Sequence, residues 1–267
     1  MIQGSLGSCL LYAIYTADLP ATIHEGHDHG TEGEKDCKNG KIVTFVDDTN
    51  NIIKSNRLED IQKMAQENIT EIELYLHNNK LKANPDKTKL IVMAKPSLDK
   101  SIVTIRAHSE VIKPSNNLKI LGIYLSPDRE WTRQINETVK QLQGRLMTLR
   151  QMANLASQKT LAALAQAMIS SKILYGIQAW SGTSIENRNK IQKIINQSAR
   201  IALGPKSSRM SIYKMMSQLG WMGLDQMSDQ HTLMLAINTA NTGYPKSLNN
   251  KLSQFKTRTT RNSCEIT

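Results

Sequence analysis

Apolar residues recur at helical and strand-like intervals in the first part of the chain. Between Cys9 and Ala17 they follow helical spacing, which predicts a short buried helix. Lys41 to Phe45 is a short β-branched and aromatic run, and Asn51 to Lys54 can return beside it. These two segments predict a hairpin that carries Asp47-Asp48 at its turn.

A longer helix and three further strands are predicted before residue 126. From Leu58 to Leu76 the apolar residues step by three and four, which predicts an amphipathic helix that covers one face of a sheet. Strand candidates follow at Lys89 to Met93, Ser101 to Arg106 and Leu118 to Leu125. Residues 1–126 are therefore expected to be mixed α and β with mainly antiparallel connections.

After Trp131 the pattern predicts helices alone. The apolar stripes cover Ile135 to Leu149, Leu161 to Ile169, Ile191 to Leu203, Ser211 to Leu219 and Met227 to Asn241. The residues from about Leu248 are polar and basic, and we expect them to form a frayed tail. The fold class is thus α+β, divided at 1–126, 127–247 and 248–267.

Charge narrows the choice of partner. The 267 residues have a formal net charge of +11 and a pI near 9.5, which favours polyanions such as nucleic acid or an anionic membrane surface. Between Trp131 and Arg209 there are twelve Lys or Arg and two acids, so this segment alone carries +10. Most of the excess charge therefore lies on the predicted helices.

Cysteine use and hydropathy indicate an intracellular protein, nuclear or cytoplasmic. Cys9, Cys37 and Cys264 are widely spaced and odd in number, which does not describe a disulfide framework. The uncharged stretch from Met1 to Ala17 lacks a basic start and is interrupted by polar residues, so it does not predict a signal peptide. No apolar run reaches the length of a membrane helix.

Asp47-Asp48 is the first candidate for chemistry. Two adjacent carboxylates at the end of a rigid hairpin suit a hard divalent cation, and Mg²⁺ is commonly held by a few carboxylates plus substrate phosphates. The alternative is a polar turn between two strands.

Motifs on both sides of the acid pair favour the metal-binding interpretation. Phe45-Val46-Asp47-Asp48 resembles the aromatic-x-Asp-Asp signature of reverse transcriptases. The flanking matches, in the family's order, are Gln3-Gly4-Ser5 with the helix after it, Asn79 to Lys89, Leu118 to Ile123, Ile173 to Gly176 with Trp180, and Ile191 to Gly204. Over roughly residues 1–245 the chain resembles the C-terminal palm and thumb portion of a non-LTR retrotransposon reverse transcriptase.

The resemblance implies an RNA-directed DNA polymerase site that uses Mg²⁺, with Mn²⁺ as a substitute, deoxynucleoside triphosphates, an RNA template and a DNA primer. Asp47 and Asp48 would be the catalytic metal ligands, and Lys87 would sit near the triphosphate. The nucleotide and template pocket would be lined by Gln3, Gly4, Ser5 and Phe45. For Lys87 a solvated loop lysine is an equally open interpretation. The alternative for Ser5 is a helix-capping role.

The resemblance also implies missing parts. The family's first metal-binding aspartate and its fingers precede the Gln-Gly-Ser segment, whereas this sequence starts two residues before Gln3. We therefore expect a truncated palm with an antiparallel sheet and two covering helices, followed by an all-α thumb-like region. The chain alone is expected to have little or no polymerase activity.

The basic helices would form the thumb's contact with nucleic acid. The candidates are Lys190, Lys193, Arg200, Lys206 and Arg209. The alternative is that these charges are the solvated faces of amphipathic helices. Three functional hypotheses remain open: a reverse-transcriptase-like fragment, a non-catalytic nucleic-acid-binding remnant, and a relic without a stable fold.

A histidine-rich segment precedes the hairpin. His24, His27, His29 and Cys37 are suitable zinc ligands, but their spacing does not match a standard finger and acids surround them. We expect a solvated insertion rather than a metal site.

Overall fold

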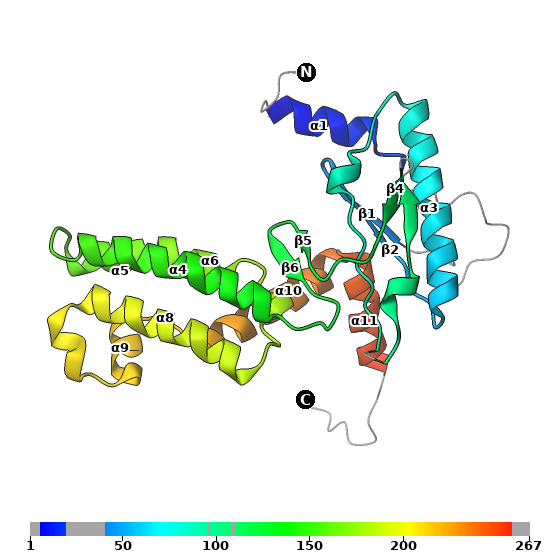
Figure 1. Ribbon diagram of the computed structural model, residues 1–267. Helices are drawn as coiled ribbons and strands as arrows, with labels where there is room; N and C mark the ends of the chain where they lie inside the picture. The colour runs from blue at the N-terminus through cyan, green and yellow to red at the C-terminus, as the bar shows by residue number, and fades with distance from the viewer. Residues whose placement is uncertain (1–5, 20–40, 96, 108–109, 258–267) are drawn as a thin grey trace. The chain divides into compact units, whose positions relative to one another are not determined.

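The chain folds into two compact units. The computed structural model describes residues 6–19, 41–95, 97–107 and 110–257. The first unit comprises residues 1–120 with 125–129, and the second comprises 121–124 with 130–267 (Figure 1). Helices and small antiparallel sheets make up the described structure, 62% of which is helical. Among the described helices, none has the length and hydropathy needed to cross a bilayer.

In the first unit, the predicted hairpin is confirmed and is tighter than expected. Strand β1 (Lys41–Phe45) pairs antiparallel with β2 (Asp48–Ile52), and Phe45 lies opposite Asp48. Only Val46 and Asp47 form the loop, so Asp48 already belongs to the second strand. A two-residue loop fixes the pairing of the strands and therefore the position of both acids.

The predicted long helix, α3 (Leu58–Asn78), packs against this hairpin. Leu19, Ile42, Ile72 and Tyr75 form a small buried cluster between the hairpin, α3 and the segment after α1 (Leu6–Tyr15). Beside it, the buried Asn68 donates from Nδ2 to Oδ1 of Asn51 at 3.2 Å. The cluster holds one face of the hairpin against the helix.

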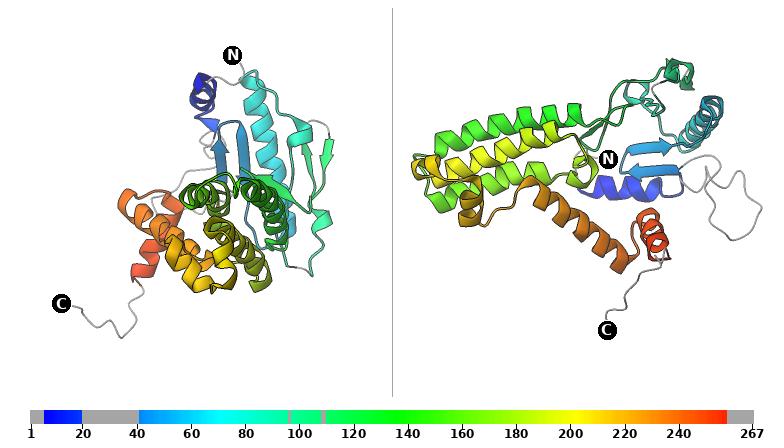
Figure 2. Two further views of the ribbon diagram at one scale, coloured as in Figure 1. Left: turned by 90° about the vertical axis from the view of Figure 1, so that its left-hand side faces the viewer. Right: turned by 90° about the horizontal axis from the view of Figure 1, so that it is seen from below.

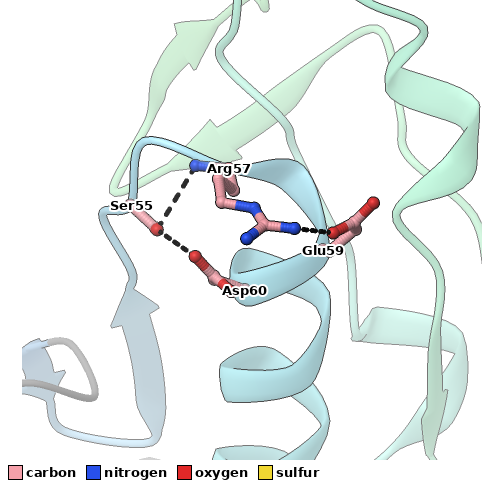
Figure 3. A network of polar contacts seen from close by, with 4 residues as sticks. All are labelled: Ser55, Arg57, Glu59 and Asp60. Atoms are coloured by element: carbon pink, nitrogen blue, oxygen red, sulfur yellow. Dashed lines mark hydrogen bonds and ion pairs between the residues drawn. The ribbon is translucent and has the colours of Figure 1, made fainter.

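Helix α3 begins within a small network of polar side chains. Ser55 Oγ accepts a hydrogen bond from the Arg57 backbone N–H at 3.4 Å and lies 3.3 Å from a carboxylate oxygen of Asp60 (Figure 3). Arg57 forms an ion pair with Glu59. Acids in the first turn also favour the positive end of the helix dipole.

The single antiparallel sheet expected for the first unit is wrong in detail. The described residues instead form separate two-stranded sheets: β1 with β2, β3 (Ile105–Ala107) with β4 (Glu110–Ile112), and β5 (Leu118–Ile120) with β6 (Ile123–Leu125). The backbone N–H of Arg106 donates to Oε1 of Gln66 on α3 at 2.7 Å, and Nε2 of Gln66 donates to the Arg106 carbonyl at 3.0 Å. A helix side chain thus occupies backbone groups of β3.

Three strand predictions need correction. Residues 89–93 contribute only an isolated bridge, between Leu90 and Pro114, although Val92 is buried as a strand would require. Residues 100–102 form a 3-10 turn, η2 (Lys100–Ile102), so the strand begins later, at Ile105. A short apolar run records burial but does not by itself distinguish a strand from an extended loop.

The third prediction, one strand over Leu118 to Leu125, is divided by a turn. β5 (Leu118–Ile120) and β6 (Ile123–Leu125) are separated by Leu121 and Gly122, which have φ values of 46° and 83°. Two consecutive left-handed residues reverse the chain in a two-residue loop, which the apolar pattern did not reveal.

The second unit is helical, as predicted. Its helices are α4 (Thr132–Met152), α5 (Gln158–Ala165), α6 (Ser171–Leu174), α7 (Ile177–Trp180), α8 (Ile185–Leu203), α9 (Ile212–Leu219), α10 (Leu224–Thr242) and α11 (Lys246–Thr257). A π-helical turn, η3 (Gln166–Ser170), joins α5 to α6, and a 3-10 turn, η4 (Pro205–Arg209), follows α8. The expected frayed tail differs from the structure, because α11 continues to Thr257.

Apolar stripes of α4, α5 and α8 enclose one core. Its fully buried members include Leu142, Leu149, Ile169, Trp180 and Ile191. Burial of these large side chains stabilises the unit, by roughly 1.5–3 kcal/mol for each fully buried aliphatic or aromatic side chain.

Helices α4 and α8 run side by side in the same direction (Figures 1 and 2). Thr132 at the start of α4 accepts from Asn187 at the start of α8, and one turn later Asn136 accepts from Lys190. Because both residue numbers rise together, the helices are parallel and their N-terminal ends lie level.

Candidate functional site

The hairpin tip holds its two acids through an unusual backbone conformation. Val46 has φ of 54°, a left-handed value that costs an L-residue about 1–2 kcal/mol and is least suited to a β-branched side chain. Strained residues of this kind persist where surrounding structure determines them and occur often at functional sites. Asp47 follows within the turn, and Asp48 is fixed by its pairing with Phe45.

Both tip acids are exposed. Within the described part of the chain, neither Asp47 nor Asp48 has a side-chain hydrogen bond or an ion pair. The adjacent acids Glu59 and Asp60 differ, since Arg57 and Ser55 engage them (Figure 3). Among the described residues, nothing therefore occupies the oxygens of these two carboxylates, and an external cation could bind them.

Helix α1 lies within electrostatic range of the tip. Burial, and then the negative charge of Asp47, raise the pKa of Tyr12 above its ordinary value. The end of this helix is tied to α3, because the Tyr15 hydroxyl donates to the Asn79 carbonyl at 2.8 Å and the Tyr75 hydroxyl donates to Asp18. The helix that follows the Gln-Gly-Ser segment is thus held near the acid pair.

The outer face of the hairpin is open. Phe45, predicted to line a nucleotide pocket, is 58% exposed, and Val43 on the same face is 41% exposed. The opposite face carries Ile42, which is buried against α3. Phe45 therefore shares the acid-bearing tip, as predicted, and is not part of the core.

Lys87, another predicted site residue, has no described contact with the tip. Lys87 ends the short turn η1 (Pro85–Lys87) and is exposed, and its backbone N–H bonds to Asn84 within that turn at 3.2 Å. No hydrogen bond or ion pair of the described residues joins its side chain to the acids. The predicted pocket residues Gln3, Gly4 and Ser5 lie outside the described residues, as do the candidate zinc ligands His24, His27, His29 and Cys37.

The chemistry of the tip suits a hard divalent cation only in part. Two carboxylates can hold Mg²⁺ together with phosphate oxygens, and Asp47 and Asp48 supply them from adjacent positions. In the described ranges there is no cluster of three His, Cys, Asp or Glu side chains that would complete a protein-only site. The tip fits as part of a metal site rather than as a whole one.

The predicted basic residues of α8 form an exposed row. Lys190, Lys193 and Arg200 are exposed and recur at helical spacing. Arg200 Nη1 also donates to the Ser207 carbonyl at 2.9 Å, which ties the helix to η4. Arg209 is exposed at the end of η4; the side chain of Lys206, in the same turn, is outside the described structure.

Two further residues of this surface were not predicted. Asn136 on α4 contacts Lys190, and the exposed Lys140 lies one turn beyond Asn136 on the same face of α4. No sequence pattern indicates that α4 and α8 run in parallel, so residues of the two helices could not be assigned to one surface. Arg188, in contrast, is neutralised by an ion pair with Asp225.

Two motifs far apart in sequence meet inside the second unit. The Tyr175 hydroxyl donates to the Leu121 carbonyl, and a Cβ on Gly122 would lie 3.6 Å from the Tyr175 ring. At Gly176, with φ of 62°, an added Cβ would lie 2.4 Å from Cδ1 of Ile123. The Tyr-Gly and Leu-Gly motifs are therefore parts of one packed junction.

Comparison with known proteins gives one informative similarity. No family model matches the chain, and no solved structure matches it. The probable RNA-directed DNA polymerase from transposon BS of Drosophila melanogaster is 27% identical over 201 residues, which is 74% of this chain and 21% of that protein. The chain thus spans about a fifth of the relative's length. The resemblance indicated by the order of its motifs is confirmed: most of this chain is similar to part of a transposon-encoded RNA-directed DNA polymerase.

Proposed function

We propose that the chain is the palm and thumb portion of a non-LTR retrotransposon reverse transcriptase. The observation that carries this proposal is the tight hairpin β1-β2, whose tip presents Asp47 and Asp48 without protein partners among the described residues. Similarity to a transposon polymerase over most of the chain supports it.

In this function Asp47 and Asp48 would hold Mg²⁺ or Mn²⁺ and, through it, the phosphates of a deoxynucleoside triphosphate. A bound divalent ion supplies charge stabilisation to phosphoryl transfer. The hairpin's own contribution is to fix both carboxylates at one point, and the exposed Phe45 beside them offers an apolar surface for the nucleotide. The primer and RNA template would extend from this tip.

The proposal implies that the chain alone does not extend a primer. A two-metal site needs more negative charge and more ligands than two carboxylates provide. This chain spans 21% of the similar transposon polymerase, and further ligands would come from the parts of that polymerase outside the match. Primer extension with Mg²⁺ on the isolated chain is expected to give no product that depends on Asp47.

The first test is direct cation binding at the tip. Titration with Mn²⁺, followed by electron paramagnetic resonance, is expected to show a weak site with Kd on the order of 10⁻³ M. Asp47→Asn should weaken it about tenfold, because the number of charged ligands sets the affinity of such sites. Glu59→Gln is the matched control, since it changes an acid whose carboxylate is already paired with Arg57. Equal effects of the two variants would refute the tip as the site.

A second candidate function is nucleic-acid binding without chemistry. The exposed row Lys190, Lys193 and Arg200, with Lys140 on the parallel helix, favours it. Such a surface would contact phosphates, which require charge more than exact geometry. Either function predicts that the second unit binds a nucleic-acid duplex.

This prediction is tested by the salt dependence of duplex binding. Replacing both Lys193 and Arg200 by Ala should lower the slope of log Kobs against log salt by about 1.8, because each phosphate contact to duplex DNA contributes about 0.9. Replacing Lys41 and Lys54, two exposed lysines of the first unit, gives a double-variant control with the same loss of charge. Fluorescence anisotropy of a labelled duplex measures Kobs at each salt concentration, and the slope follows from these values. Binding that does not respond to salt would contradict a phosphate-contacting surface.

A further inference from the structure

Lys190 is held in place by uncharged partners. Its Nζ lies 3.1 Å from Oδ1 of Asn136 on α4 and 3.3 Å from Oδ1 of Asn187 on its own helix. An ammonium has three N–H donors, so two are directed at amide oxygens and one remains for a ligand. Most exposed lysines move freely and lose side-chain entropy when they bind.

The amide oxygens orient the ammonium without neutralising its charge. Within the described ranges Lys190 has no ion pair, although Glu186 lies one turn earlier on α8. The neighbouring Arg188 shows the other arrangement, because Asp225 cancels its charge. A fixed and uncancelled positive charge is the arrangement that an anionic ligand requires.

A partly buried hydrogen-bond network orients Asn187 in turn. Asn187 is buried, and its Nδ2 donates to Thr183 Oγ1 at 3.0 Å and to Thr132 Oγ1 at 3.1 Å. Its side-chain orientation is thereby set, since the amide nitrogen must face the two hydroxyls and the oxygen must face Lys190. The positive ends of α4 and α8 lie level at the same place and add to the attraction for an anion.

We infer that Asn136 and Asn187 are positioning residues that pre-organise Lys190 for one phosphodiester group of a bound nucleic acid. The inference rests on the nucleic-acid binding proposed above and names one phosphate contact within it. Lys193, for which no such amide contacts occur in the described structure, would contribute charge without a fixed position. Removing the neighbouring amides should therefore weaken duplex binding through Lys190 and not through Lys193.

The test is a double-mutant cycle between Asn136 and Lys190. Asn136 is exposed on α4, so Asn136→Ala leaves the core intact and keeps the charge of Lys190. We expect it to weaken duplex binding about two- to tenfold, the range for losing one pre-organised side chain, without changing the salt slope. Lys190→Ala should lower the slope by about 0.9. Asn136→Ala should have no further effect in the Lys190→Ala background and its full effect in the Lys193→Ala background.

Asn189→Ala is the matched control, because Asn189 is an exposed asparagine next to Lys190 in sequence with no described hydrogen bond. It should leave affinity and slope unchanged, and far-UV circular dichroism should show all variants folded. Asn136→Ala that weakens binding equally with and without Lys190, or an equal effect of Asn189→Ala, would overturn this inference alone. Absence of salt-dependent duplex binding by the unaltered chain would overturn the nucleic-acid proposal as well.

Discussion

Single residues of the hairpin tip show why a sequence motif can be recognised before its geometry is known. Phe45, Asp47 and Asp48 were predicted to lie together from their adjacency, and the pairing of β1 with β2 brings them together. The left-handed backbone of Val46 could not be predicted, because valine disfavours that conformation. A local preference was overruled by the two-residue loop that the strand pairing requires.

Tyr75 makes a pH-dependent contribution to stability. Burial, and next its hydrogen bond to Asp18, raise the pKa of Tyr75 to about 12. A phenol whose pKa is higher in the folded state than its ordinary value of 10.0 stabilises the fold below pH 10, and this contribution is lost as pH rises toward 12. The free energy of unfolding should therefore decrease across that window.

Tyr75→Phe tests this dependence. The variant should be less stable than the original chain at pH 8 by about 1–2 kcal/mol, through loss of the hydrogen bond to a charged acceptor. The difference should shrink between pH 10 and pH 12, as measured by urea unfolding followed by circular dichroism. Tyr213→Phe is the control, because Tyr213 is 84% exposed. A difference that stays constant with pH would show that the Tyr75 hydroxyl does not titrate as described.

At the scale of elements, long helices were predictable and short strands were not. The stripe from Leu58 to Leu76 corresponds to α3, and the stripes from Ile135 and Ile191 correspond to α4 and α8. A repeated spacing over several turns averages out local exceptions. Strands of three residues, such as β3, contain too few positions for alternation to be distinguished from chance.

The junction between the Tyr-Gly and Leu-Gly motifs makes a prediction about glycine. Gly176→Ala should destabilise the second unit by more than about 1 kcal/mol, because an L-residue is strained at φ of 62° and the new Cβ would meet Ile123 at 2.4 Å. Ile123→Ala in the same chain should restore part of the loss by removing the clashing atoms. Thermal unfolding followed by circular dichroism measures both effects.

Gly144→Ala is the control for that experiment. Gly144 lies in the interior of α4, and an added Cβ would have nothing within 4 Å. Alanine should therefore stabilise the helix by roughly 0.5–1 kcal/mol through its higher helix propensity. If both glycine variants shifted stability in the same direction, the described packing at Gly176 would be incorrect.

At the scale of the whole molecule, the two units differ in tryptophan content and in the size of their buried core. All three tryptophans, Trp131, Trp180 and Trp221, belong to the second unit, which also has the larger buried core. The first unit buries fewer large hydrophobic side chains, among them the cluster of Leu19, Ile42, Ile72 and Tyr75. The first unit should therefore unfold at a lower denaturant concentration.

Comparing two probes tests this expectation. Far-UV circular dichroism records both units, including the long helix α3, whereas tryptophan fluorescence records only the second. In a urea titration the ellipticity should begin to fall before the fluorescence changes, giving transitions that do not coincide. A single coincident transition would show that the units unfold cooperatively. The separation into mixed and helical parts could be predicted from the change in hydrophobic period near Trp131, but the relation of α4 to α8 depends on contacts that no local pattern encodes.

The parallel arrangement of α4 and α8 has a consequence for how length changes would act on this protein. Helices that run the same way cannot be joined by a tight loop, so residues 153–184 carry the chain back before α8 begins. An insertion or deletion there could leave every helix intact yet slide α8 along α4. A slip of one turn would replace Lys190 beside Asn136 by Glu186 and invert the sign of the charge at that end of the bundle.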